Sequence, residues 1–376
     1  MKIALVYDRV NKWGGAERVL LALHEIWPKA PLYTAVYNRA TASWAKVFEV
    51  KSSFLQHLPF AKSTHELYPM LTPLAFESFD FSSFDVVLSV TSAEAKGIIT
   101  KSNTLHICYC LTPTRYLWSG YQDYLDEPGM GVFNPLAQFL MKIFVPPLRS
   151  WDLKASKRPD FYLAISENVK GRIKRYYQRD SQVIYPPVDT DKFRPGKGKS
   201  DEKYFLIVSR LVPYKKIDYA ISAFNKLGWQ LKIVGSGIDE KRLKSLAGNN
   251  IEFIYSDLSD EKLCIYYQNC QALIFPQEED FGLTPIEAQT CGSPVIAYNG
   301  GGVKESVISG EIGELYNSQT EDSLITALKT FQKKQYSPSA CRKNALRFSK
   351  EIFKKKMKKT IEQLWDWLAK DLYLLK

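Results

Sequence analysis

The sequence is poor in cysteine and has no long uncharged apolar run. Its 376 residues include six cysteines, and none of them form a C-x-x-C pair. A set this sparse predicts neither a dense disulfide framework nor a zinc module, so we expect reduced core thiols in a cytoplasmic protein. No uncharged run reaches the ~18 residues that a membrane-spanning helix needs, and the opening MKIALVYDRV lacks the features of a signal peptide. The sequence therefore indicates a protein that is soluble or is attached to a membrane surface at most.

The overall composition is that of a folded globular protein. Hydrophobic residues make up 45% and charged residues 24%, which excludes a disordered or fibrous chain. The length favours about two domains. Lys and Arg number 51 against 40 Asp and Glu, a formal charge of +11, and this charge attracts nucleic acid, anionic lipid or phosphorylated substrates. Because the basic residues form no recognisable nucleic-acid module, we expect no nucleic-acid partner.

Apolar runs rich in β-forming residues alternate with segments long enough for helices. Parallel strands need crossover connections of this length, so the alternation predicts an α/β fold of two doubly wound halves. Ligands of such sheets bind beyond the carboxyl ends of the strands. The predicted strands are residues 2–8, 31–38, 84–92, 105–111 and 161–166 in the first half, and 204–211, 231–237, 251–256, 272–276 and 294–298 in the second.

A stretch rich in proline, glycine and charge separates the two halves near residues 186–202. We expect an N-terminal domain over residues 1–190 and a C-terminal domain over 200–350. The last segment, 351–376, predicts an amphipathic helix that packs back on the first domain. The opposite face of this helix is lysine-rich, and it is either solvated or rests on anionic lipid. Its apolar positions are Phe353, Met357, Ile361, Trp365, Leu368 and Leu372.

The segment 276–302, PQEEDFGLTPIEAQTCGSPVIAYNGGG, carries the strongest chemical signal. Thr284 is predicted as the N-cap of a helix in which Glu287 completes a capping box, and Gly292 is predicted to close that helix. On this interpretation alone, Glu287 needs no function beyond capping. However, the helix start follows a strand, so its free N–H groups form a ready phosphate site. Gly282 lets a ligand approach the backbone closely.

Glu279 lies in the loop eight residues before Glu287, and EEDFGLTPIEAQTCGSPVIA resembles the signature of the retaining family-4 glycosyltransferases. The resemblance implies the GT-B fold, in which two Rossmann-like domains face a cleft. It also implies that Glu279 contacts the donor sugar, that Glu287 holds the ribose, and that the amides between them bind the diphosphate. The donor-binding residues that it implies here are Phe281, Gly282, Leu283, Thr284 and Glu287.

A second element, VSRLVPYKKID at 208–218, places Arg210 and Lys215 after the first strand of the second half. Both could be ordinary surface charges. Their similarity to the family's cationic pair implies that they neutralise the leaving diphosphate, which makes Arg210, Lys215 and Glu279 the implied catalytic residues. We expect no metal, because the D-x-D form at 189–191 lies in the inter-domain stretch. We expect no nicotinamide cofactor either, because the GSG at 235–237 is too short for a dinucleotide fingerprint.

In the first half, Gly14 and Gly15 follow the first strand and precede a helix. They could simply form a turn, but their position resembles the family's glycine-rich loop, whose amides approach the donor phosphates. Arg115 and Trp118 are candidates for acceptor or lipid-phosphate binding, although core packing explains an aromatic residue equally well. The sequence departs from the family at Leu111, where members often carry a histidine that contacts the donor sugar.

The resemblance extends over nearly the whole chain and is strongest to bacterial mannosyltransferase-like members of polysaccharide biosynthesis. It implies a metal-independent retaining enzyme that moves a hexose, such as mannose from GDP-mannose, to an undecaprenyl-type lipid-linked or oligosaccharide acceptor. This would place it in cell-surface polysaccharide or lipopolysaccharide synthesis on the inner face of the plasma membrane. Two alternatives stay open: a nucleotide-sugar-binding protein with lost catalysis, suggested by Leu111, and a nucleotide-sugar 2-epimerase of the same fold. The sequence leaves the donor base, sugar, acceptor and linkage undetermined.

Overall fold

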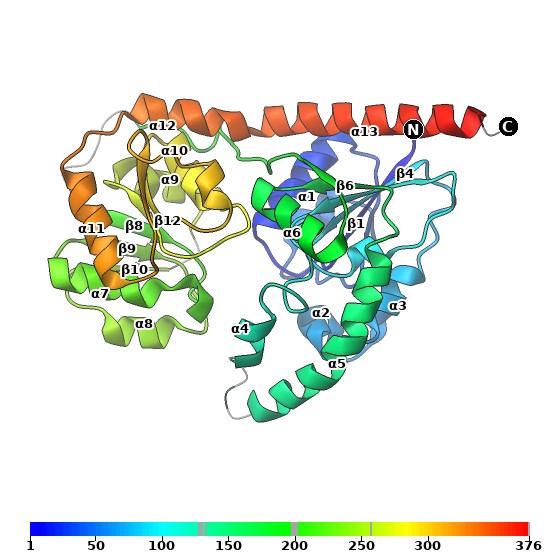
Figure 1. Ribbon diagram of the computed structural model, residues 1–376, viewed down its shortest axis with the longest axis horizontal. Coiled ribbons are helices and arrows are strands. Elements are labelled where there is room, and N and C mark those ends of the chain that lie inside the picture. Colours follow the sequence, from blue (N-terminus) through cyan, green and yellow to red (C-terminus); the bar gives the residue numbers. More distant parts are fainter. Residues whose placement is uncertain (127–130, 132–133, 197–201, 256–257, 375–376) are drawn as a thin grey trace. The chain divides into compact units, whose positions relative to one another are not determined.

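The computed structural model describes residues 1–126, 131, 134–196, 202–255 and 258–374. The chain divides into two compact units, one formed by Met1–Pro186 with Phe353–Lys376 and the other by Pro187–Ile352. Each unit is a parallel β-sheet with helices packed on it (Figure 1). This confirms the expected pair of doubly wound α/β sheets.

The sheet of the first unit has the strand order β3-β2-β1-β4-β5-β6-β7. All its pairings are parallel, with Leu5 of β1 opposite Leu32 on one side and Leu88 on the other. The strands are β1 Ile3–Tyr7, β2 Leu32–Thr34, β3 Val50–Ser52, β4 Val86–Thr91, β5 Leu105–Cys110, β6 Phe161–Ala164 and β7 Ser181–Val183. The α-helices are α1 Gly15–Ile26, α2 Ala61–Thr64, α3 Thr72–Glu77, α4 Tyr121–Asp126, α5 Asn134–Ala155, α6 Glu167–Tyr177 and the terminal α13 Lys350–Leu374, with short 3₁₀ turns η1 Ser43–Val47, η2 Phe54–His57, η3 His65–Leu67 and η4 Ala95–Gly97.

The sheet of the second unit has the order β10-β9-β8-β11-β12-β13. Its strands are β8 Phe205–Val208, β9 Leu231–Val234, β10 Ile251–Ile254, β11 Leu273–Phe275, β12 Val295–Tyr298 and β13 Gly313–Tyr316. Its helices are α7 Ile217–Leu227, α8 Glu240–Leu246, α9 Asp260–Asn269, α10 Leu283–Thr290, α11 Glu321–Gln332 and α12 Pro338–Ala345, with 3₁₀ turns η6 Pro213–Lys215, η7 Gly302–Glu305 and η8 Leu346–Phe348.

Both sheets reverse their strand order at one point, between β1 and β4 in the first unit and between β8 and β11 in the second. The connections after two such strands leave toward opposite faces of the sheet. The loops at their carboxyl ends therefore bound a ligand-binding position. In the second unit, the loops that follow β8 and β11 are the ones that carry Arg210, Lys215 and Glu279.

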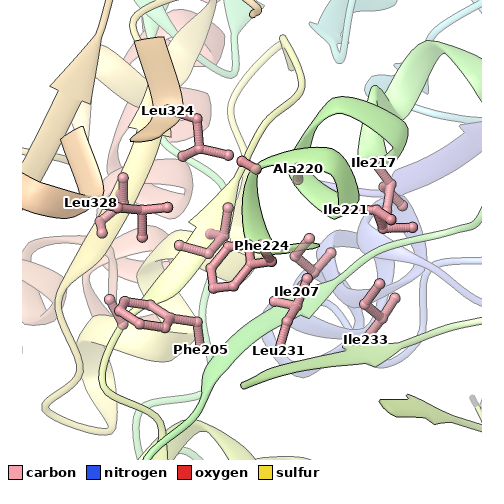
Figure 2. Close-up of a cluster of buried hydrophobic side chains, with 14 of the residues drawn as sticks. Phe205, Ile207, Ile217, Ala220, Ile221, Phe224, Leu231, Ile233, Leu324 and Leu328 are labelled. Atoms are coloured by element: carbon pink, nitrogen blue, oxygen red, sulfur yellow. The ribbon is translucent and has the colours of Figure 1, made fainter. Parts of the chain in front are cut away.

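The core of the second unit forms where helix α7 covers strands β8 and β9 and meets α11. Every side chain of this cluster is buried, and each buried Ile, Leu or Phe contributes about 1.5–3 kcal/mol to stability. Figure 2 shows Ala220, Ile221 and Phe224 of α7 beside Phe205, Ile207, Leu231 and Ile233 of the strands and Leu324 and Leu328 of α11. The β-strands beneath the loops are therefore held firmly in place.

The terminal helix α13 buries the first three apolar positions that the sequence singled out. Phe353, Met357 and Ile361 are 2% exposed or less, and the ring of Phe353 lies 6.0 Å from that of Tyr109 on β5. All six cysteines are free and buried, which confirms that they are core thiols.

Three strands were missed in the sequence: β3, β7 and β13. The first two are three-residue edge strands, VKS and SQV, with two polar residues each and no buried side chain, so they lack the apolar run that marked the central strands. Strand β13 reads GELY and begins at Gly313, where an added Cβ would overlap the carbonyl of Val295. The sequence feature that marks this strand is a glycine required by a close approach of two backbones, and not a hydrophobic run.

Candidate functional site

The loops after β8 and β11 meet through an ion pair between Lys215 and Glu279. The Lys215 side chain is 8% exposed and that of Glu279 is 22% exposed. Lys215 ends the turn η6 Pro213–Lys215, and Glu279 lies between β11 and α10. The structure therefore brings together two of the three implied catalytic residues, which are 64 positions apart in the sequence.

Arg210 joins this pair through Tyr214, a residue that the sequence did not single out. The Arg210 Nη2 donates a 2.7 Å hydrogen bond to the Tyr214 hydroxyl. The Lys215 ammonium lies 5.0 Å from the centroid of the same ring, within the range of a cation–π contact. The side chains of Arg210, Tyr214, Lys215 and Glu279 thus form one continuous chain of contacts at the switch point. Arg210 itself is exposed, so its guanidinium is accessible to a ligand.

Two glycine-containing loops hold these two segments in place. The GSG loop passes so close to the β8 loop that a Cβ on Gly235 or Gly237 would overlap the carbonyl oxygen of Ser209 or Leu211. Leu211 also donates a 2.9 Å hydrogen bond to Ser236. The sequence excluded this loop as a dinucleotide site, and the structure gives it a supporting position.

The glycine run after β12 holds the β11 loop in the same way. Gly301 pairs with Glu279 in an isolated parallel bridge, and Gly302 donates a 2.8 Å hydrogen bond to the Glu279 carbonyl. A Cβ on Gly301 would overlap that carbonyl, and one on Gly302 would overlap the carbonyl of Asp280. The backbone path of Glu279 is therefore fixed by contacts that only glycine allows.

We expect Gly301→Ala to destabilise the protein more than a matched change at Gly310. Both glycines have positive φ, 66° and 83°, but a Cβ on Gly310 would meet only the Lys334 ammonium at 3.9 Å. Both variants carry about 1 kcal/mol or more of backbone strain, and Gly301→Ala adds about 1–3 kcal/mol of overlap. Urea unfolding measures the difference. Equal losses in the two variants would contradict the tight packing around Glu279.

Helix α10 begins earlier than the sequence predicted, so the assignment of Thr284 as N-cap is wrong. The helix spans Leu283–Thr290, its N-cap is Gly282 at φ 88°, and no side chain caps it. Leu283 and Thr284 are half-exposed in the first turn, where N–H groups have no partner within the helix. Phe281 is buried with its ring 5.5 Å from that of Phe348, so its side chain packs the core and only its backbone is available to a ligand.

Glu287 lies one turn beyond the helix start and does not form the predicted capping box. Its side chain is buried, and Oε2 accepts a 2.9 Å hydrogen bond from the Tyr267 hydroxyl of α9. The close of the helix is as predicted: Gly292 has φ 88°, its N–H bonds to Gln289, and the N–H of Ser293 bonds to Ala288. These two bonds make a Schellman motif.

The glycine-rich loop of the first unit is covered by an acidic side chain. Gly14 is the N-cap of α1 and Gly15 its first residue, but a Cβ on Gly14 would lie 3.1 Å from a carboxylate oxygen of Glu17. Glu17 also accepts a 2.6 Å hydrogen bond from Tyr7, and burial raises the pKa of this carboxyl. When ionised, Glu17 opposes an anion at these amides, so donor binding by Gly14 and Gly15 stays a prediction.

Leu111 immediately follows β5 and is half-buried. His106 lies in the middle of the sheet, completely buried and 2.9 Å from the Ser89 hydroxyl, and burial lowers its pKa to about 3. It does not take the place of the absent histidine. Arg115 and Trp118 occupy the turn after β5, half-exposed, and the Trp118 indole donates a 2.8 Å hydrogen bond to Asp152 on α5.

Glu94 follows β4 at the switch point of the first unit and is a buried carboxyl. Its Oε1 accepts a hydrogen bond from the Tyr116 hydroxyl. Burial, reinforced by the neighbouring Asp8, raises the pKa of Glu94 to about 7, against the opposing effect of Tyr116, Lys96 and Arg9. The folded protein therefore favours the protonated form of this group.

We expect Glu94 to make the free energy of unfolding fall as pH rises from about 4.5 to 7, and Glu94→Gln to remove this part of the pH dependence. A raised carboxyl pKa means that the folded state holds the proton more tightly than the unfolded chain. The contribution of this carboxyl to stability is therefore complete at low pH and is lost as pH rises through 7. The change is on the order of 3 kcal/mol. Urea unfolding at pH 5 and pH 8 measures it, and parallel profiles for the two proteins would refute the assignment to Glu94.

Within the described ranges of the chain, no group of three His, Cys, Asp or Glu residues is arranged to hold a metal ion. Asp189 of the D-x-D form accepts hydrogen bonds from the backbone N–H groups of Asp191 and Lys192, as in a local turn. Among the described residues, no helix combines the length and low charge needed to cross a bilayer.

Comparison with known proteins finds a family model that matches part of the chain. Residues 189–348 match the family model of the glycosyl transferases group 1. The matched segment holds the contact chain from Arg210 to Glu279 and the whole of α10. A D-inositol 3-phosphate glycosyltransferase of Mycobacteroides abscessus is 33% identical to the chain over 162 residues, 37% of this chain and 36% of the relative. An alpha-1,3/1,6-mannosyltransferase of Dictyostelium discoideum is 25% identical over 193 residues, 39% and 46% of the two lengths.

The chain thus spans less than half the length of these two curated relatives. Its architecture, by contrast, is matched along almost the full length. The crystal structure of Anabaena HepE in complex with UDP and glucose superposes with a TM-score of 0.69, covering 96% of this chain and 99% of that one at 18% identity. A likeness at this identity establishes the fold, and the fold is GT-B.

Proposed function

We propose that the chain is a retaining glycosyltransferase that transfers a hexose, mannose or a relative, from a nucleotide diphosphate donor to a lipid-linked saccharide acceptor. We further propose that it needs no metal ion and acts in cell-surface polysaccharide synthesis at the cytoplasmic face of the membrane. The observation that carries the proposal is the contact of Lys215 with Glu279 at the switch point of the segment that matches the glycosyltransferase family.

The chemistry follows from charge. Departure of a nucleoside diphosphate concentrates negative charge on its phosphate oxygens, and rate depends on stabilising that charge more in the transition state than in the ground state. Arg210 offers a planar fork and Lys215 a compact ammonium for these oxygens. The first-turn N–H groups of α10, at Leu283 and Thr284, add backbone donors. A pyrophosphate that binds Lys215 competes with Glu279 for the ammonium and so frees this carboxylate for a sugar hydroxyl.

Glu287 lies one turn into helix α10, where the hydroxyl of Tyr267 orients its carboxylate, and this position suits the proposed contact with the ribose. A buried carboxylate held by a tyrosine keeps a fixed direction, which favours the selection of a hydroxyl pair. Support for a nucleotide-sugar donor also comes from Anabaena HepE, whose structure was determined with UDP and glucose.

Thermal unfolding in the presence of GDP, UDP and ADP tests the donor site, and the preferred nucleotide's sugars are then incubated with a lipid-linked acceptor. We expect stabilisation by one nucleoside diphosphate and an acceptor-dependent product that retains the anomeric configuration of the donor, with undiminished rate in EDTA. Leu111 favours a second candidate, a nucleotide-sugar-binding protein without turnover. Nucleotide stabilisation with no product on any acceptor would favour it, and a C2-epimerised donor would instead indicate an epimerase.

A further inference from the structure

The outer face of helix α5 in the first unit is apolar and open. Leu136, Phe139, Leu140 and Ile143 are 55%, 59%, 39% and 48% exposed. The spacing i, i+3, i+4, i+7 places them in a single stripe along the helix, which in a globular protein normally faces the core. Large contiguous apolar surfaces of this kind mark an interaction site.

The inner face of the same helix is already packed, so the open stripe cannot turn inward. Val145 and Leu148 are buried against Leu117, with Met141 and Phe144 packed at the margin of the cluster. The Arg149 Nε donates a 2.6 Å hydrogen bond to the Leu117 carbonyl and fixes the rotation of the helix. Helix α5 therefore has two apolar faces, of which the described fold covers one.

The charge around the stripe selects its partner. From residue 134 to 151 the sequence contains no Asp or Glu and carries only Lys142 and Arg149, and Lys154 and Lys157 follow. Lys142, Lys154 and Lys157 are exposed, and Asp152 is buried against Lys96. A symmetric contact with a second copy of this basic chain would bring like charges together, whereas an apolar stripe flanked by lysines complements the surface of an anionic bilayer.

We propose that the outer face of α5 inserts into the interface of an anionic lipid bilayer. The helix lies in the membrane surface, with Leu136, Phe139, Leu140 and Ile143 among the acyl chains and the lysines among the headgroups. This surface differs from the lysine-rich face of α13, for which the sequence suggested lipid contact.

The docked helix also contacts one of the candidate acceptor residues, Trp118, which lies in the turn after β5. Trp118 donates to Asp152 on α5, and the guanidinium of Arg149 lies 5.6 Å from the centroid of the Trp118 ring. Insertion of the outer face of α5 would hold Trp118, and with it Arg115, close to the headgroups, where a lipid phosphate is found. This role in acceptor binding rests on the proposed function, whereas bilayer binding does not.

Sedimentation of the full chain with phosphatidylcholine vesicles, with and without phosphatidylglycerol, tests the proposal. We expect binding that requires phosphatidylglycerol and weakens with salt, and a loss of about tenfold or more in Ile143→Asp and Phe139→Asp. Ile265→Asp is the matched control, because Ile265 is 55% exposed on α9 of the other unit. All three positions are exposed, so circular dichroism should show intact folds.

Equal vesicle binding by Ile143→Asp and the unchanged protein would overturn the proposal, as would the absence of binding to anionic vesicles. A dimer in light scattering that Ile143→Asp dissociates, without vesicle binding, would assign the stripe to self-association instead. Nucleotide-induced thermal stabilisation is measured on the same variants. If nucleotides stabilise the protein but it does not bind vesicles, the bilayer inference fails and the proposed function stands. If the protein binds vesicles but no nucleotide stabilises it, the proposed function fails and the bilayer inference stands.

Discussion

Replacing Lys215 or Glu279 with alanine is expected to lower sugar transfer by about 10²–10³-fold, the usual effect of removing one group that stabilises transition-state charge. Lys215→Ala removes the ammonium from the leaving diphosphate, and Glu279→Ala removes the partner that orients it in the absence of donor. Initial rates at saturating donor and acceptor measure the loss. Because both groups act on the reacting end of the donor, kcat should fall more than KM rises.

The matched control is the ion pair between Lys226 and Glu321, which lies in the same unit but joins α7 to α11. Lys226→Ala and Glu321→Ala should leave turnover near that of the unchanged protein. Near-normal turnover in Lys215→Ala or Glu279→Ala would remove the basis of the proposed function. Thermal unfolding of each variant separates a lost reaction from a lost fold.

Breaking the buried pair between Lys96 and Asp152 is expected to cost about 3–5 kcal/mol of stability, because it leaves an uncompensated charge inside the first unit. The Lys96 ammonium donates to the Ala93 carbonyl, the Thr114 hydroxyl and Asp152, and both charged side chains are 1% exposed or less. Burial alone would lower the pKa of Lys96, but Asp152 reverses this and holds the pKa above its ordinary value. Lys96→Met and Asp152→Asn test the pair by urea unfolding.

The surface pair between Lys354 and Glu25 in the same unit provides the control, and Lys354→Met should cost at most about 1 kcal/mol. A variant that replaces both Lys96 and Asp152 with apolar residues should recover much of the loss, because no unpaired charge remains. A small effect of Lys96→Met alone would show that water reaches this pair. Asp152→Asn should also alter the fluorescence of Trp118, whose indole donates to Asp152.

The central strands could be predicted from the sequence because they are buried on both faces and read as continuous apolar runs, as in FDVVLSVTS and LHICYCL. The short edge strands could not, since their pairing depends on a neighbour and not on their own composition. The N-cap at Thr284 failed for a related reason. The residues from Thr284 to Glu287 match the local pattern of a capping box. The helix nevertheless begins after Gly282, whose φ of 88° and position against the ring of Phe275 are set by tertiary packing.

In the candidate site, the cations and carboxylates could be predicted, but the side chains that orient them could not. Tyr214 lies between Arg210 and Lys215 in the sequence, and the only hint of its role was an aromatic residue immediately before a lysine. Tyr267 reaches Glu287 from another helix, 20 positions away. No sequence spacing indicates such a contact, because it arises only when α9 and α10 pack on the same sheet.

The glycines beside the loops after β8 and β11 imply that the proposed donor site of the second unit is pre-organised. Its backbone path is set during folding by contacts at Gly235, Gly237, Gly301 and Gly302, so little conformational entropy is left to lose when a ligand arrives. Changes in donor preference should therefore come from substitutions of side chains while the backbone of these loops stays the same. Insertions in these loops should be poorly tolerated.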